Sequence, residues 1–157
     1  MDYGFGGGLS AAFPSQVIID VTELCNLSCT HCPHPEFKKS DFYGGRSLSP
    51  ALVSKAITEV ATAGRGHVQY VRFASDGEPM LNKAIYAMLT EAVEKSGTFV
   101  SLTTNGTLLT PPRIEQLIAT GVHLVDISID ADSAASPALH SARGTHRHVC
   151  RFEGATL

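Results

Sequence analysis

The chain has 157 residues, the usual length of one domain, and its 43% hydrophobic and 17% charged content excludes an intrinsically disordered protein. Twelve basic and fifteen acidic residues leave a net charge of −3, which gives no indication of nucleic acid or of an anionic membrane as a partner. The sequence contains no apolar run of about 18 residues and no basic, apolar leader, so we expect a cytoplasmic protein without a membrane span.

The first predicted strand covers residues 16–21 and leads directly into a group of cysteines. Its apolar residues follow one another almost without interruption, which is typical of a strand buried on both faces. Residues 1–15 are rich in glycine, and we expect them to form a flexible lead-in. Ser49 and Pro50 supply the N-cap and first turn of a helix that we expect to end at Gly64.

Two further strand–helix units are expected downstream. A strand over 67–74 and a short turn precede a second helix, with one apolar face formed by Leu81, Ile85, Met88, Leu89 and Ala92. A strand over 98–104 precedes a third helix, which Thr110 and two prolines open.

A fourth strand is predicted over 124–130, with apolar Val125, Ile127 and Ile129 alternating with polar Asp126, Ser128 and Asp130. Strands that alternate with helices predict an α/β fold with a parallel sheet. Because the fourth strand has one polar face, we favour (βα) repeats of a partial TIM barrel over an open doubly wound sheet. Residues 16–157 would form this incomplete barrel, truncated after about four βα units.

The end of the sequence predicts one more helix. Thr145 could cap it, and its apolar residues would be Val149, Phe152 and Leu157. Cys150 would then be a free cysteine on that helix, and the outer edge of the fourth strand would remain unpaired and prone to aggregation.

Three of the four cysteines follow the first strand with the spacing Cys25-x3-Cys29-x2-Cys32. Three thiolates on one loop can bind three irons of a cubane cluster and leave the fourth iron open to another ligand. Thiolates also suit zinc, and His31 or His34 could complete a Cys3His site. The spacing favours an iron–sulfur cluster, although it does not by itself decide the metal.

The segment Cys25-Asn26-Leu27-Ser28-Cys29-Thr30-His31-Cys32-Pro33 resembles the cluster motif of the radical S-adenosylmethionine (radical SAM) enzymes. The resemblance implies a 4Fe–4S cluster held by Cys25, Cys29 and Cys32, whose unique iron binds S-adenosyl-L-methionine (SAM). It implies that an electron donor such as flavodoxin or ferredoxin reduces the cluster, and that SAM is cleaved to a 5′-deoxyadenosyl radical that abstracts hydrogen from a substrate. It also implies a full or partial (βα) barrel.

Other segments match this family in chain order. Ser75-Asp76-Gly77-Glu78-Pro79 resembles the segment whose backbone binds the methionyl amino group, although Asp76 replaces the commoner glycine. Thr103-Thr104-Asn105-Gly106 resembles a second family segment. The resemblance thus implies cofactor-binding roles for His31, Gly77, Glu78, Pro79, Thr103, Asn105, Ser128, Asp130 and Arg143. Ordinary turns, a solvent-facing histidine and a solvated arginine are the plainer interpretations, and we expect Asp126 to be structural.

The resemblance covers about residues 16 to 145 and only the first part of the family's catalytic domain. We therefore expect a radical SAM enzyme or a fragment of one, which a partner chain could complete. The alternative hypotheses are a non-catalytic zinc or iron–sulfur module and an inactive truncated product. An open-sheet nucleotide-binding protein is disfavoured, because cysteines stand where a Gly-rich phosphate loop would follow the first strand.

Overall fold

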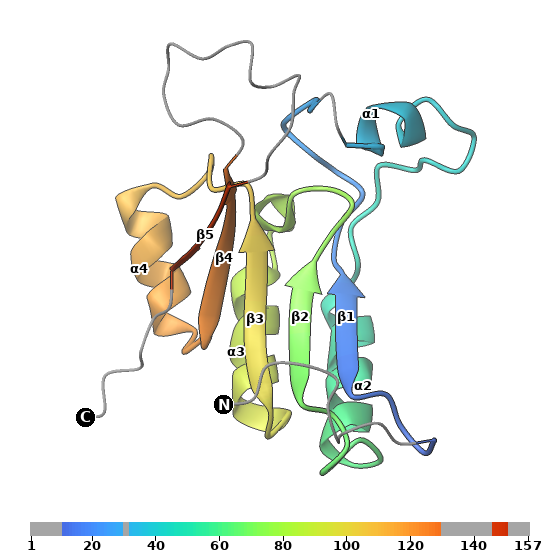
Figure 1. Cartoon of the computed structure of the whole chain (residues 1–157), viewed down its shortest axis with the longest axis vertical. Coiled ribbons are helices and arrows are strands. Elements are labelled where there is room, and N and C mark those ends of the chain that lie inside the picture. Colours follow the sequence, from blue (N-terminus) through green and yellow to red (C-terminus); the bar gives the residue numbers. More distant parts are fainter. Residues whose placement is uncertain (1–10, 30–31, 130–145, 151–157) are drawn as a thin grey trace.

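The computed structural model describes residues 11–29, 32–129 and 146–150 (Figure 1). Strands and helices alternate along most of this length, as the sequence predicts. The elements are β1 (Gln16–Asp20), α1 (His34–Phe37), α2 (Pro50–Ala61), β2 (Tyr70–Ala74), η1 (Pro79–Leu81), α3 (Ile85–Lys95), β3 (Phe99–Thr104), α4 (Pro111–Ala119), β4 (Leu124–Ile129) and β5 (His146–Cys150).

The strands form one sheet in the order β1-β2-β3-β4-β5. The first four are parallel to one another, so all four carboxyl ends lie at the same edge of the sheet, the upper edge in Figure 1. In the same view α2 and α3 lie behind the strands. Parallel strands that are neighbours both in sequence and in space form the α/β arrangement of a (βα) barrel fragment, and this confirms the predicted fold class.

The helix boundaries follow local signals in the sequence. The Ser49 hydroxyl accepts a hydrogen bond from the backbone N–H of Leu52 at 3.4 Å, and Pro50 occupies the first turn of α2. The expected second helix begins later than predicted, because Leu81 belongs to the short helix η1 and α3 begins at Ile85. Asn82 accounts for the break: its side-chain amide donates to the carbonyl oxygens of Val21 and Leu48 at 2.9 and 3.1 Å.

The hydrophobic core lies between the sheet and its helices. Apolar side chains at alternate strand positions pack against α2 and α3, and the fully buried ones include Val71, Phe73, Val100, Leu102, Val53, Ile57, Met88 and Leu89. Full burial of one such side chain contributes about 1.5–3 kcal/mol to stability. The core therefore fixes the strands, and with them the loops that leave their carboxyl ends.

The prediction that β1 is buried on both faces is wrong. Ile19 is buried against the helices, whereas the adjacent Ile18 is 57% exposed. The reason is that the helices cover only one face of the sheet, and β1 is its edge strand. An uninterrupted apolar run therefore does not establish that both faces are covered.

The prediction of a helix after Thr145 is also wrong for the described residues 146–150. These residues form β5, which pairs antiparallel with β4 from Val125↔Cys150 to Ile129↔His146. Pairing with β4 satisfies backbone N–H and C=O groups that its outer edge would otherwise leave exposed. Cys150 accordingly lies on a strand, and the expected unpaired edge of β4 is covered.

Among the helices within the described ranges, none has the length and apolar character that a membrane span requires.

Candidate functional site

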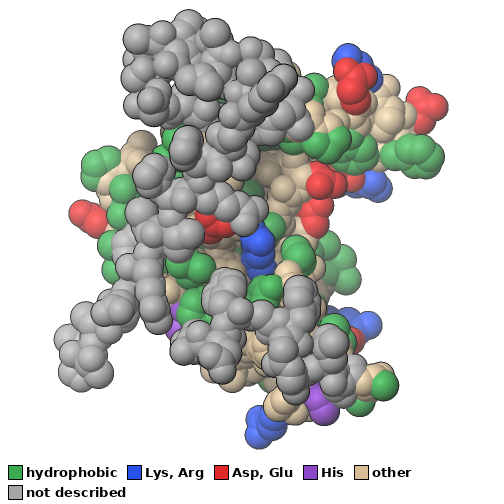
Figure 2. Space-filling view, viewed as in Figure 1, with side chains coloured by type: hydrophobic (Ala, Val, Ile, Leu, Met, Phe, Trp, Pro, Cys, Tyr) green, Lys and Arg blue, Asp and Glu red, His purple; other side chains and the backbone are tan. Residues whose placement is uncertain are grey.

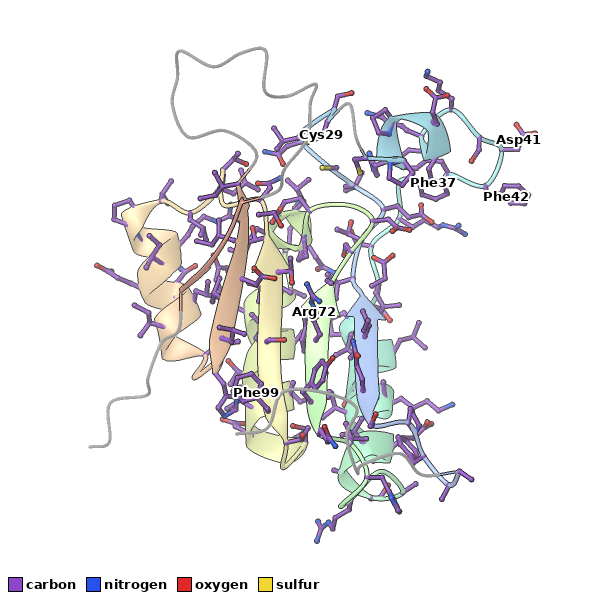
Figure 3. The ribbon with its side chains drawn as sticks, in the orientation of Figure 1. Cys29, Phe37, Asp41, Phe42, Arg72 and Phe99 are labelled. Atoms are coloured by element: carbon purple, nitrogen blue, oxygen red, sulfur yellow. The ribbon has the colours of Figure 1, made fainter. Side chains whose placement is uncertain are left out.

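The cysteine loop lies at the edge of the sheet where the parallel strands end. Cys29 is above the carboxyl ends of the strands, and Phe37, Asp41 and Phe42 belong to a lobe beside it (Figure 3). In a (βα) barrel this end carries the ligand-binding loops. The structure thus places the predicted metal ligands where a barrel enzyme would have its active site.

The three cysteines are all half-buried. The backbone N–H of Cys32 donates to the carbonyl oxygen of Cys29 at 3.3 Å, which closes the second half of the loop. Cys25 Sγ accepts a backbone hydrogen bond from Leu27 at 3.5 Å, and Cys32 Sγ accepts one from His34 at 3.4 Å. Hydrogen bonds to sulfur tune the reduction potential of an iron–sulfur cluster.

The lobe formed by residues 34–46 is fastened to the exit of β1 by Glu23. Its carboxylate accepts hydrogen bonds from the backbone N–H groups of Gly44 and Arg46 at 2.9 and 3.0 Å, and from the Arg46 guanidinium at 3.0 Å. These contacts, the Arg46 backbone bond above all, lower the pKa of the Glu23 carboxyl to about 2. Ionised Glu23 therefore binds Gly44 and Arg46, so that the intervening segment, which contains the cysteines, forms a closed loop.

Buried His34 fastens the same lobe from inside. Its ring Nε2 lies 2.8 Å from the carbonyl oxygen of Glu23, and its ring contacts those of Phe37 and Tyr43 edge to face. Acidic, basic and hydrophobic side chains are mixed on the surface of this lobe, at the upper right in Figure 2. Because His34 is held by the β1 exit, it orients the chain immediately after Cys32.

Gly77 and Glu78 connect the end of β2 to the cysteine loop. The backbone N–H of Glu78 donates to the carbonyl oxygen of Leu24 at 2.6 Å. A side chain at Gly77 would clash with the same carbonyl oxygen and would put its Cβ 2.7 Å from that of Thr22. The structural demand for glycine at position 77 therefore comes from the close approach of two backbone segments.

The Glu78 carboxylate is buried and is held entirely by the protein. It accepts hydrogen bonds from the Thr104 hydroxyl at 2.6 Å, from the backbone N–H of Asn105 at 2.7 Å and from that of Met80 at 3.0 Å. Pro79 is also buried and opens η1. Glu78 thus joins the ends of β2 and β3 by its side chain, while its backbone reaches the cysteine loop.

Asn105 is brought directly to the cysteine loop. Its side-chain amide donates to Asn26 Oδ1 at 3.0 Å, and the Asn26 amide donates to Thr107 Oγ1 at 2.8 Å.

The remaining predicted site residues in the described ranges lie on the strands. Thr103 accepts a hydrogen bond from Arg72 Nε at 2.9 Å, and Ser128 is exposed near the end of β4. His31, Asp130 and Arg143 lie outside the described residues.

Asp126, expected to be structural, forms an ion pair with Arg72 across the sheet at 3.3 Å. Figure 3 shows Arg72 midway along β2, below the loops that carry the cysteines. Both residues lie on the face that the helices leave open, since their strand neighbours Val71, Phe73 and Val125 pack into the core. This pair therefore belongs to the interior side of the barrel fragment.

Three residues of the site are absent from the sequence prediction: Glu23, Arg72 and Thr107. Two more have contacts that it does not predict: Asn26, which it includes only as part of the cysteine motif, and His34, which it considers only as a zinc ligand. Thr107 had a local signal, because an asparagine that bonds to the backbone N–H two residues ahead is a common turn, here at 3.0 Å. The others act through partners distant in sequence, and no spacing rule identifies such contacts.

The donor chemistry of the loop fits an iron–sulfur cluster. It offers three thiols, and backbone N–H groups are already directed at Cys25 Sγ and Cys32 Sγ. Across the part of the chain that the structure describes, no three ligating side chains are gathered into a preformed metal site. The loop supplies the ligands, and metal binding would draw them together.

Comparison with known families agrees with this site. The family model of the radical SAM superfamily matches residues 19–155. The chain therefore belongs to the radical SAM superfamily, as its cysteine motif predicts.

The similar proteins have names that give different activities. The chain is 31% identical over 121 residues to an AdoMet-dependent heme synthase of Methanosarcina barkeri, covering 77% of this chain and 32% of that protein. It is 38% identical over 118 residues to a probable GTP 3′,8-cyclase of Methanosarcina mazei, covering 72% and 32%. A PqqA peptide cyclase of Streptomyces rochei is 29% identical over 144 residues, covering 90% and 36%. The chain thus spans about a third of the length of these relatives.

Among solved structures, BtrN in complex with AdoMet and 2-DOIA is similar to this chain with a TM-score of 0.60 and 24% identity. The match covers 72% of this chain and 44% of BtrN. At this identity the likeness concerns the fold, and it supports the assignment of a partial barrel.

Proposed function

We propose that this chain is the cluster- and SAM-binding portion of a radical SAM enzyme. The observation that carries the proposal is that Glu78 joins the cysteine loop to the ends of β2 and β3 through its backbone and its carboxylate. Three segments that the family resemblance assigns to one site are therefore connected by hydrogen bonds. The family membership supports the same interpretation.

In this proposal Cys25, Cys29 and Cys32 hold the cluster. When bound and reduced, a 4Fe–4S cluster supplies the electron that cleaves SAM to a 5′-deoxyadenosyl radical, which abstracts hydrogen from the substrate. The protein's own part is to hold the three thiolates and to position SAM. The SAM site would comprise the Gly77–Pro79 backbone, Thr103, Asn105 and Ser128, with His31, Asp130 and Arg143 contributing from outside the described residues.

The relatives differ in what their names say they do, since they are named as a heme synthase, a probable GTP cyclase and a peptide cyclase. We therefore limit the proposal to the step that precedes substrate chemistry. A small reduced protein such as flavodoxin or ferredoxin would deliver the electron. A longer polypeptide or a partner chain would complete the barrel and supply the substrate contacts.

Anaerobic reconstitution with iron and sulfide, followed by an assay for 5′-deoxyadenosine with dithionite and SAM, tests the proposal. The expected result is a brown protein with about four irons per chain that forms 5′-deoxyadenosine. Cys29→Ala should lose both the colour and the product. Cys150→Ala is the matched control and should keep both, because Cys150 lies on β5, outside the loop. A colourless protein with stoichiometric zinc, or product formation by Cys29→Ala, would overturn the proposal.

A further inference from the structure

Asn26, Thr107 and Asn105 form a closed ring of side-chain hydrogen bonds. Asn26 Nδ2 donates to Thr107 Oγ1 at 2.8 Å, the Thr107 hydroxyl donates to Asn105 Oδ1 at 2.6 Å, and Asn105 Nδ2 donates to Asn26 Oδ1 at 3.0 Å. Every member donates to the next in the same direction around the ring. Such head-to-tail arrangements polarise one another, so the ring is stronger than its separate bonds.

The ring connects two segments about 80 residues apart in sequence, since Asn26 and Asn105 are separated by 79 positions. Asn26 stands directly after Cys25, inside the cysteine loop. Asn105 directly follows β3, and its backbone N–H donates to the buried Glu78 carboxylate at 2.7 Å. The ring therefore attaches the first ligand of the loop to a turn that the core holds in place.

Cys25 is held on both sides as a result. On one side, the carbonyl oxygen of Leu24 accepts the Glu78 N–H at 2.6 Å. On the other side, the Asn26 side chain is bound in the ring. We propose that Asn26 is a positioning residue that fixes Cys25 relative to the Asn105 turn, so that cluster and SAM are held in one mutual geometry; this inference rests on the proposed function.

The ring leaves one hydrogen on the Asn105 amide nitrogen available to bind a ligand. A side-chain amide nitrogen carries two hydrogens, and the ring uses one from Asn105 and one from Asn26. Asn105 can therefore keep its place in the ring and still donate to SAM. Loss of Asn26 would remove the bond between the Asn105 amide nitrogen and the cysteine loop, and both the Cys25 position and the donor toward SAM would become less well defined.

The inference predicts a specific defect in Asn26→Ala and in Thr107→Val. Both variants keep the three cysteines, so both should bind the same amount of iron as the wild type. The electron paramagnetic resonance signal of the reduced cluster should change on SAM addition only at concentrations about tenfold higher than for the wild type. The midpoint of urea unfolding should change little, because Asn26 and Thr107 are exposed.

Thr107→Ser is the matched control, because it keeps the hydroxyl that closes the ring and should titrate with SAM as the wild type does. The double variant Asn26→Ala/Thr107→Val should be no worse than either single variant, since each already opens the ring. Wild-type SAM titration in Asn26→Ala, additive effects in the double variant, or an equal defect in Thr107→Ser would overturn the inference.

A second measurement separates this inference from the proposed function. In cluster-free protein, amide hydrogen exchange at residues 24–27 and 105–107 should accelerate together in Asn26→Ala and in Thr107→Val. Unchanged exchange would overturn the ring as a positioning device, whatever the protein binds. A wild-type protein that binds no cluster, or whose electron paramagnetic resonance signal does not change on SAM addition, would instead contradict the proposed function itself.

Discussion

The buried carboxylate of Glu78 accepts the backbone N–H of Asn105 at 2.7 Å, and this bond joins the end of β2 to the end of β3. The same carboxylate accepts the Thr104 hydroxyl at 2.6 Å and the Met80 N–H at 3.0 Å. Three donors surround a side chain that is 2% exposed. This environment matches an acceptor-only group, and an amide would place its own N–H donors against these donors.

Glu78→Gln should therefore lower the free energy of unfolding by about 2–3 kcal/mol, because at least one buried donor loses its acceptor. Urea unfolding followed by far-UV circular dichroism measures the loss. Glu115→Gln serves as the control, because Glu115 is exposed on α4 and its replacement should change stability by less than about 0.5 kcal/mol. Equal stability of the two variants would contradict the role given to the Glu78 carboxylate.

A second prediction concerns Gly77, which lies where the end of β2 meets the cysteine loop. Gly77→Ala would place a methyl group against the carbonyl oxygens of Leu24 and Thr22, both backbone atoms that can yield only if the loop moves. We expect a loss of about 1–3 kcal/mol in stability together with reduced iron incorporation during reconstitution.

The control for Gly77→Ala is Gly66→Ala, where a Cβ meets nothing within 4 Å but the backbone φ of +78° is unfavourable for alanine. Its cost of about 1 kcal/mol should come without any loss of iron. If both variants reconstitute equally well, the contact between Gly77 and the cysteine loop is not needed to hold the cluster ligands.

The sequence allowed most of the regular structure to be predicted, because it depends on local signals. Strand and helix alternation, the Ser49 cap and the barrel-like strand order all follow from residues close together in the chain. The exposure of Ile18 and the strand at residues 146–150 did not follow, since each depends on what a distant segment covers or leaves open.

In the candidate site, too, local features could be predicted from the sequence and contacts between distant residues could not. The cysteine spacing and the two turn motifs are contiguous in sequence and could be recognised there. The contacts that join them could not, because Glu78 meets Thr104 across 26 residues, and Asn26 meets Asn105 across 79. Both residues belong to quoted motifs, yet only the structure shows which atoms their side chains bind.

The pair Glu91–Lys95 on α3 predicts a pH dependence of stability. Glu91 Oε1 accepts from Lys95 Nζ at 2.8 Å and from the Ser54 hydroxyl of α2 at 2.6 Å. The Lys95 hydrogen bond, followed by that of Ser54, lowers the pKa of Glu91 below its ordinary 4.5, and Glu91 raises the pKa of Lys95 above its ordinary 10.5.

The stability difference between the wild type and Glu91→Gln should therefore be small and constant between pH 4.5 and 10.5. As the pH falls through the lowered pKa of Glu91, its ionised form and this contribution are lost. As the pH rises through the raised pKa of Lys95, the ammonium and its contribution are lost. Urea unfolding of both proteins from below pH 4.5 to above pH 10.5 checks this dependence, and a stability difference that grows toward either extreme would contradict it.

The Arg72–Asp126 pair gives the last prediction. Arg72 Nη2 lies 3.3 Å from Asp126 Oδ2, and the two side chains are 25% and 11% exposed. The second carboxylate oxygen of Asp126 is buried and accepts no hydrogen bond from the described residues. Arg72→Met would leave this carboxylate without its cation in a largely desolvated place. Asp126→Asn would instead leave the guanidinium of a side chain that is 25% exposed and that water can still reach.

We therefore expect Arg72→Met to cost about 3 kcal/mol of unfolding free energy and Asp126→Asn to cost less. The double variant Arg72→Met/Asp126→Asn should recover part of the loss, because it removes the unpaired charge that makes the first substitution costly. Urea unfolding of the three variants and the wild type measures this double-mutant cycle. Losses that simply add in the double variant would show that the two side chains stabilise the sheet independently, with no ion pair between them.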